Sequence, residues 1–235
     1  MYNYFAKYYD KIMGNRQNYI NFIDYIIKNN NITPKNILDL ACWTWKILSL
    51  LDVKYNKYWI DYSENMIEIA RKNVKKGTFF KQDIKNIQIN NLKFDLITCF
   101  FDSINHLLDF SDWEKVFNSS YNLLNKNWIF LFDINTKYKL DKISNYKPIM
   151  YEIDNDIIFF TTEYIWNEVV RWNIKIFNNF ESNNYKLYNE SIEEKSYDLS
   201  KIKKSLNFFS KVIILDHNYN EAFEESERVF FICIK

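Results

Sequence analysis

Short apolar runs alternate with amphipathic stretches over most of the first half of the chain. A short continuous apolar run is typical of a strand buried on both faces, whereas apolar residues spaced three or four apart predict a helix. Strands that alternate with helices in this way predict βαβ units and a parallel sheet. The runs that we interpret as strands are Asn36–Ala41, Tyr58–Asp61, Thr78–Gln82, Phe94–Phe100 and Trp128–Asp133.

Amphipathic stretches around these runs predict helices. Ser63 is a suitable N-cap for one of them, and Glu64 next to it suits the positive end of the helix dipole. Gly77 lies just beyond the apolar face of that helix, where a left-handed C-cap is expected. The predicted helices are a lead-in over residues 2–30, Thr44–Leu51, the segment from Ser63 to Val74, and Asp112–Leu124.

The pattern changes after residue 138. Three β-rich runs with polar breaks follow, which predicts an antiparallel sheet inserted as a lid. We expect one α/β domain over residues 1–145 and 195–235, with the β-rich lid insert at 146–194. The β-rich runs are Ile157–Thr162, Val169–Phe180 and Tyr185–Ile192, and they are followed by a helix at Leu199–Phe208 and closing strands at Val212–Asp216 and Arg228–Ile234.

Composition and charge exclude several classes of protein. Of the 235 residues, 48% are hydrophobic and 26% are charged, which is typical of a globular domain. Lys and Arg number 31 against 30 for Asp and Glu, so no basic excess points to a nucleic-acid partner. No apolar run reaches the roughly 18 residues of a membrane span, and no apolar signal core is present, so a cytoplasmic location is expected. Three distant cysteines favour neither a disulfide scaffold nor a zinc site, and we expect no metal.

Acidic residues stand at the ends of three predicted strands. Asp39 belongs to the first, Asp61 ends the second 22 residues later, and Asp83 follows the third. The carboxyl ends of parallel strands are where open α/β sheets bind ligands. An acid at the tip of the second strand is placed to accept hydrogen bonds from ribose hydroxyls. Asp83, beside Ile84, could accept one from an adenine amino group.

Five ordered segments carry a specific resemblance, in which x marks a tryptophan. They are ILDLAC-x-T-x-K (37–46), Y-x-IDYSENMIEIA (58–70), FFKQDI (79–84), FDLITCFFDSINHL (94–107) and LLNKN-x-IFLFDINT (123–136). In these segments the chain resembles the class I S-adenosylmethionine-dependent methyltransferases, strongly over residues 1–145 and weakly beyond.

This resemblance implies a Rossmann-like, mostly parallel seven-stranded sheet with an antiparallel last strand, covered by the β lid. It implies S-adenosyl-L-methionine as cofactor and methyl transfer to a small-molecule acceptor. It also places Asp102 and His106, after the fourth strand, as candidates for proton transfer. The residues that it implies for cofactor binding are Asp39, Ala41, Trp43, Asp61, Tyr62, Met66, Asp83, Ile84 and Phe100.

The chain has 2 glycines and 7 tryptophans, whereas average usage of about 7% would give roughly 16 glycines. Four of these tryptophans stand where the family has glycine, two of them in the turn that passes under the cofactor. A side chain there meets either the ligand or a strained backbone. We therefore hypothesise that the source translates a stop codon as glycine and that these positions are glycines, so their codons are not TGG. The positions are Trp43, Trp45, Trp59 and Trp128.

The sequence bears on three rival functions. A dinucleotide oxidoreductase needs a third small residue where this chain has Leu48. Nucleic-acid amino-methyltransferases typically carry an Asn/Asp-Pro-Pro-aromatic motif after the fourth strand, and this chain has Cys99-Phe-Phe-Asp102 there. A non-catalytic methyltransferase-like module, with its cofactor pocket blocked by genuine tryptophans at 43 and 45, stays open.

The sequence leaves two possible roles open for several residues. Asp39 either contacts the cofactor or caps the turn, and His106 is either a base or a hydrogen-bonded structural histidine. Met66 either touches the adenine or belongs to the core. Arg228 either points toward the substrate or pairs with a glutamate. The aromatic lead-in, which includes Tyr9, either folds over the cofactor or packs ordinarily; the class of acceptor and the oligomeric state also stay open.

Overall fold

The computed structural model describes residues 4–43, 45–181 and 184–235. Its core is a seven-stranded sheet in the order β10-β11-β5-β4-β1-β2-β3. Neighbouring strands are parallel except β11, which is antiparallel to both β5 and β10. The strands are β1 (Asn36–Leu40), β2 (Asn56–Asp61), β3 (Thr78–Lys81), β4 (Phe94–Cys99), β5 (Leu124–Asn135), β10 (Lys211–Asp216) and β11 (Arg228–Ile234).

Helices cover both faces of this sheet. On one face, α5 and α7 pack through buried residues such as Trp113 and Ile202. On the other face, α2, α3 and α4 pack through residues such as Ile23, Leu48 and Ile67. The result is a three-layer α/β/α domain, and its helices are α2 (Gln17–Asn29), α3 (Lys46–Leu50), α4 (Glu64–Asn73), α5 (Phe110–Leu123) and α7 (Leu199–Ser205), with short 3₁₀ turns η1 (Ile84–Asn86) and η2 (Ser103–His106).

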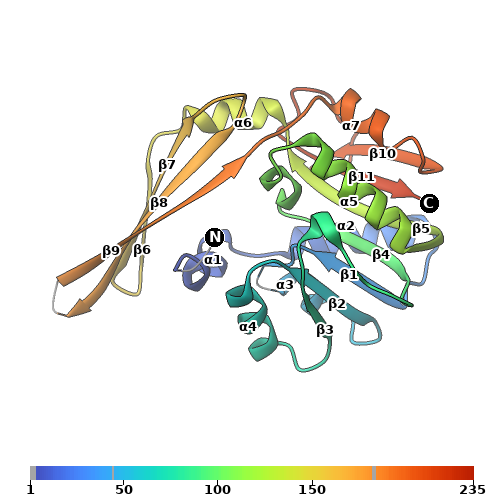
Figure 1. Cartoon of the computed structure of the whole chain (residues 1–235), viewed down its shortest axis with the longest axis horizontal. Coiled ribbons are helices and arrows are strands. Elements are labelled where there is room, and N and C mark those ends of the chain that lie inside the picture. Colours follow the sequence, from blue (N-terminus) through green and yellow to red (C-terminus); the bar gives the residue numbers. More distant parts are fainter. Residues whose placement is uncertain (1–3, 44, 182–183) are drawn as a thin grey trace.

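A second, antiparallel sheet projects from this domain (Figure 1). The helix α1 (Ala6–Met13) packs on it, with Phe5 and Tyr9 in one apolar cluster with Phe160 and Ile176. The lead-in and the lid are also joined by a hydrogen bond from Tyr8 Oη to a buried carboxylate of the lid at 2.6 Å. The lid strands are β6 (Ile149–Ile153), β7 (Asp156–Tyr164), β8 (Val170–Glu181) and β9 (Asn184–Glu194), and α6 (Lys137–Ser144) precedes them.

The predicted fold class is confirmed, with local corrections. Ser63 Oγ accepts a hydrogen bond from the Met66 N–H at 3.4 Å, so it caps α4 as expected. Gly77 is not the C-cap of that helix, because α4 ends at Asn73 and is capped by Val74. Gly77 instead lies against a tryptophan ring in β2. The lead-in is two helices rather than one, with a break that includes Gly14. In the described residues, no helix is long and apolar enough to span a membrane.

Candidate active site

The strand order reverses between β1 and β4, which is where open α/β sheets bind ligands. Both strands end there in turns with left-handed backbone conformations. Such a conformation costs an ordinary residue about 1–2 kcal/mol and is an outlier for a bulky one. Strain of this kind is concentrated at functional sites. The φ angles are 52° at Ala41, 51° at Trp43, 76° at Trp45, 59° at Phe101 and 49° at Asp102.

Asp61 ends β2 and binds the backbone of the turn after β1. One carboxylate oxygen accepts a hydrogen bond from the Trp43 N–H at 2.8 Å, and the other accepts one from the Ser63 N–H at 2.8 Å. Burial raises the pKa of this carboxyl to about 6, although the backbone donors act in the opposite direction. A carboxylate has about four acceptor sites, so Asp61 can hold the turn and still accept further hydrogen bonds.

The indole of Trp43 fills the space over this turn. Its ring stacks on Tyr9 with 4.7 Å between the centroids, and its Nε1 donates a hydrogen bond to Ser103 Oγ at 2.7 Å. The ring borders both a cavity of about 350 Å³ under the lid and one of about 10 Å³ beside the turn. A space of the second size holds at most about one water molecule. With tryptophan at 43, a nucleoside therefore has no room beside the turn.

The backbone of this turn suits a bound nucleoside, whereas its side chains do not. Trp43 and Trp45 both adopt the conformation that favours glycine. Trp45 Nε1 is buried without a hydrogen-bond partner among the described residues, and an unsatisfied buried donor costs about 1–3 kcal/mol. Glycine at both positions would remove the rings, the strain and the orphaned donor, and would expose the peptide groups to a ligand.

Three other tryptophans differ in how well their surroundings accommodate the ring. Trp59 is fully buried, its Nε1 finds no partner in the described part of the chain, and its ring would lie 2.1 Å from a Cβ at Gly77. Trp128 has ordinary strand backbone in β5, and nothing in the structure calls for glycine there. Trp113 is an accommodated core residue, because its Nε1 donates to the Leu107 carbonyl at 2.8 Å. The glycine hypothesis thus finds structural support at 43, 45 and 59.

Asp39 is buried at the base of the same turn. Its Oδ1 accepts a hydrogen bond from Thr98 Oγ1 at 2.6 Å, which ties β1 to β4. Burial raises the pKa of Asp39 to about 7, although the Thr98 hydroxyl lowers it. Asp39 lines the small cavity together with Arg16 and Lys46. It therefore has a structural partner and also borders the place proposed for the cofactor.

The other residues proposed for cofactor binding surround the turn at different depths. Met66, Ile84 and Phe100 are buried, and Met66 packs between α1 and the lid. Tyr62 is 73% exposed, and Asp83 caps η1 by accepting a hydrogen bond from the Lys85 N–H at 2.9 Å. Phe100 lines the small cavity, and the other four line neither cavity.

The larger cavity lies between the lid and the carboxyl ends of the core strands. Its volume of about 350 Å³ is in the range of small-molecule sites. Asp102 and His106, the two candidates for proton transfer, both line it. Among the described residues, no three His, Cys, Asp or Glu side chains are grouped to hold a metal. Its polar lining residues are Asp102, His106, Asn135, Lys139, Glu194 and Arg228.

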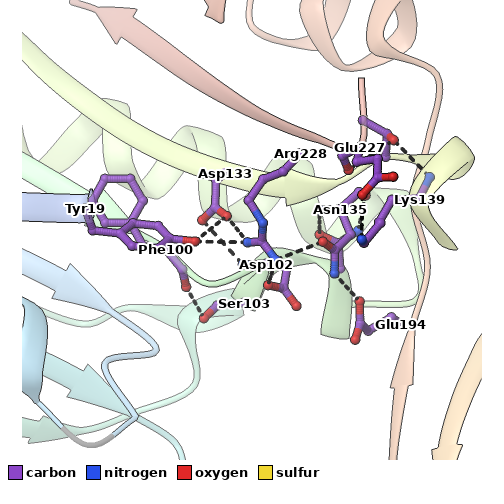
Figure 2. A network of polar contacts seen from close by, with 12 residues as sticks. Tyr19, Phe100, Asp102, Ser103, Asp133, Asn135, Lys139, Glu194, Glu227 and Arg228 are labelled. Atoms are coloured by element: carbon purple, nitrogen blue, oxygen red, sulfur yellow. Dashed lines mark hydrogen bonds and ion pairs between the residues drawn. The ribbon is translucent and has the colours of Figure 1, made fainter. Parts of the chain in front are cut away.

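Arg228 reaches this cavity from β11. Figure 2 shows its guanidinium beside the carboxylates of Asp102 and Asp133. It donates to Asp102 Oδ1 at 2.7 Å, to Asn135 Oδ1 at 2.9 Å, and also to Asp133 Oδ2. Burial raises the pKa of the fully buried Asp133 to about 6, although Arg228 lowers it. Arg228 therefore faces the cavity and pairs with two aspartates rather than with a glutamate.

His106 is held in one tautomer by the lid. Its Nδ1 lies 3.1 Å from the carbonyl oxygen of Glu193, and a carbonyl only accepts, so the proton is on Nδ1. Burial lowers the pKa of His106, which leaves the ring neutral at neutral pH with a lone pair on Nε2. His106 can therefore be both a structural histidine and a base, because its hydrogen bond to the lid uses Nδ1 and leaves the lone pair of Nε2 for a proton.

Sequence reasoning missed Glu194. It is buried at the end of β9 and lines the cavity, and burial raises the pKa of its carboxyl to about 8. Alternate residues of a strand share a face. The apolar Ile192, two positions earlier, lines the same cavity. This alternation could have indicated from the sequence that Glu194 faces inward.

We expect the protein to lose stability as the pH rises from about 5 to about 8. Four buried carboxyls have raised pKa values in the folded chain: about 7 for Asp39, 6 for Asp61, 6 for Asp133 and 8 for Glu194. Over this range they bind more protons folded than unfolded, where their pKa is about 4. Their stabilising protonation is therefore lost as the pH passes each folded value, while His106 opposes the trend with one proton.

Melting temperatures across this pH range check the expectation. Asp39→Asn keeps an acceptor for Thr98 and removes one titrating group, so its melting temperature should fall less steeply with pH. Asp24→Asn, on the exposed face of α2, is the matched control and should follow the parent. A parent melting temperature that rises from about pH 5 to about pH 8 would contradict the burial of these carboxyls.

Comparisons with known proteins lead to a single family. A family model described as "Methyltransferase domain" matches residues 37–127. A putative methyltransferase of Geobacillus sp. (strain WCH70) is 28% identical over 252 aligned positions, which cover 100% of this chain and 99% of that protein. The putative methyltransferase YqeM of Bacillus subtilis (strain 168) is 26% identical, with 98% of this chain and 96% of that protein covered.

Solved structures show the same likeness with the lid included. The crystal structure of an S-adenosylmethionine-dependent methyltransferase from Clostridium acetobutylicum ATCC 824 has a TM-score of 0.85 at 29% identity, covering 100% of this chain and 98% of that one. CalS10, an amino pentose methyltransferase from Micromonospora echinaspora, has a TM-score of 0.78 at 10% identity with the same coverage, a likeness of fold alone. The matched domain, the strand order and these relatives are those of a class I S-adenosylmethionine-dependent methyltransferase.

Proposed function

We propose that the protein moves the methyl group of S-adenosylmethionine onto a small molecule held in the cavity under the lid. One observation carries this proposal: the turn held by Asp61 borders that cavity directly, through residue 43. S-adenosylmethionine supplies a methyl group already activated by its sulfonium. The task of the chain is to orient two molecules and to exclude water.

The cofactor residues would act from three sides. Asp61 would accept hydrogen bonds from the ribose, and the peptide groups of Ala41 and position 43 would face the methionine part. Asp83 and Ile84 would border the adenine. Asp39 would support the turn from below. Further contacts are proposed for Tyr62, Met66 and Phe100.

His106 is the group that we propose to take a proton from the acceptor. Its Nε2 carries the free lone pair, because Nδ1 donates to the lid backbone. Asp102 Oδ1 accepts a hydrogen bond from the Arg228 guanidinium at 2.7 Å and is engaged in that ion pair. Asp102 therefore acts as a positioning residue for the cavity wall.

A second candidate function follows from the small cavity. With genuine tryptophans at 43 and 45, the space of about 10 Å³ beside the turn favours a module that binds no cofactor. The two candidates differ in the identity of two residues, so we propose glycine at 43 and 45 for the enzyme. The codons at these positions and the mass of the natural protein distinguish them.

Asp61→Ala should weaken cofactor binding in the Trp43→Gly/Trp45→Gly background. Hydrogen bonds to a charged group contribute about 1.5–3 kcal/mol, so the Kd measured by titration calorimetry should rise roughly ten- to a hundredfold. Asp52→Ala, in the exposed turn after α3, is the matched control and should leave the Kd unchanged. An unchanged Kd in Asp61→Ala would remove Asp61 from the site.

A further inference from the structure

Glu194 is a buried carboxyl that no cation contacts among residues 4–43, 45–181 and 184–235. Its Oε2 accepts a hydrogen bond from Asn135 Nδ2 at 2.8 Å, and its Oε1 accepts one from Trp172 Nε1 at 2.9 Å. Both donors are neutral, and the residue is only 4% exposed. Burying a carboxylate without a positive partner is costly. The cavity therefore holds an acid whose counter-ion is missing from the described part of the chain.

The cations that line the cavity with this acid, Arg228 and Lys139, are bound to other carboxylates. Arg228 donates to Asp102 and Asp133, and Lys139 Nζ pairs with Glu227 at 2.6 Å. Glu227 also pairs with Lys142, so three cations face three carboxylates before Glu194 is counted. Asp102 opposes ionisation of Glu194 more strongly than Arg228 favours it. His106 is neutral and adds no positive charge. Ionised Glu194 would therefore be a carboxylate without a cation in the described part of the chain, and a positively charged ligand would balance it.

The apolar part of the wall suits the same ligand. Phe160 and Trp172 line the cavity. Tyr9 and Phe101 line it too, but their ring faces are covered by Arg16 and by the stacked rings of Trp43 and Tyr19. The faces of aromatic rings attract cations, and this attraction reaches about 2 kcal/mol or more where water is excluded. A carboxylate as ligand would instead add a further negative charge to this wall. A neutral hydroxyl would leave Glu194 in its protonated form, with no charge to attract the ligand.

We propose that the methyl acceptor is an amine, which the cavity binds as its ammonium ion against Glu194. That the bound amine is the methyl acceptor rests on the proposed function. The binding of the amine itself needs no cofactor. It assigns to Glu194 the selection of the acceptor and to the aromatic wall the exclusion of water.

Calorimetry on the unmodified full chain without cofactor tests the proposal. The probes are three matched pairs of amine and hydroxyl analogue: tyramine with tyrosol, hexylamine with hexanol, and glucosamine with glucose. The carboxylate 4-hydroxyphenylacetate is added to the first pair. At least one amine should bind about tenfold or more tightly than its hydroxyl partner, and the carboxylate should bind more weakly than either.

Glu194→Gln should abolish this preference, because it keeps the shape and removes the charge. Glu193→Gln is the matched control, since Glu193 pairs with Arg171 at 2.7 Å, and it should keep the preference. Its backbone carbonyl still holds His106. If Glu194→Gln does not fold, the selectivity of the parent chain alone decides.

Equal binding of amines and hydroxyl analogues, no amine binding at all, or an unchanged preference in Glu194→Gln would each overturn the inference. Failure of the proposed function looks different. In that case amines bind as expected, while the Trp43→Gly/Trp45→Gly chain binds no S-adenosylmethionine.

Discussion

Trp43→Gly/Trp45→Gly is expected to change a chain that does not bind S-adenosylmethionine at about 1 mM into one with a Kd near about 1 μM. This is a change of roughly 4 kcal/mol in binding free energy. Trp43 lines both cavities, as do Tyr9 and Phe101, so removal of the indole should open space between about 350 Å³ under the lid and the turn. The backbone of both residues is in the left-handed region, at φ 51° and 76°, so glycine also relieves about 2–4 kcal/mol of strain.

Titration calorimetry measures the gain, and two other tryptophans serve as controls. Trp166→Gly, on a side chain 66% exposed in the lid, should leave binding unchanged. Trp113→Gly should lower stability by about 3–5 kcal/mol or more without any gain in binding, because that indole is fully buried and hydrogen-bonded. Micromolar binding by the chain with both tryptophans would show that the turn rearranges and that glycine is not required.

Arg228→Met should lower the free energy of unfolding by about 3 kcal/mol, the lower end of the range for breaking a buried ion pair. The lower end applies because the Arg228 side chain is 28% exposed, whereas Asp133 is completely buried. For a chain of this size the melting temperature should fall by roughly 6–12 °C. The loss should be larger at alkaline pH, because Asp133 must then carry its charge without a partner.

A second substitution tests this explanation. Asp133→Asn combined with Arg228→Met should recover part of the lost stability, because no uncompensated charge is then buried. Arg171→Met breaks a partly exposed pair with Glu193 and should cost about 1 kcal/mol or less. If Arg228→Met and Arg171→Met had equal melting temperatures, the network in Figure 2 would contribute nothing to stability.

The core sheet could be predicted from the sequence because its strands are buried on both faces. Such strands have continuous apolar runs, which are easily recognised. β6 was missed for the opposite reason: Ile149–Ile153 is an edge strand with three exposed central residues, so burial leaves no pattern in it. The expectation for Gly77 was wrong because its position follows from packing against Trp59 rather than from the end of a helix.

The site could be predicted only in its local parts. Asp61 was proposed from its distance from Asp39 along the chain, and the structure places its carboxylate against the turn after β1. The pairing of Arg228 with Asp102 spans 126 residues and depends on β11 lying beside β5, which spacing alone does not reveal. The left-handed turn was inferred from the family's glycines, and the conformation of Trp43 and Trp45 supports that inference.

The contact between α1 and the lid has a consequence for the synthesis of the chain. Tyr8 and its partner Asp156 are 148 residues apart, so the helix leaves the ribosome long before the strand that binds it. At about 5–20 residues per second, this interval lasts roughly 7–30 s. During that time Phe5 and Tyr9 lack the lid strands that later cover them. The nascent helix is therefore a candidate client for a chaperone, and the roof of the cavity is among the last parts to form.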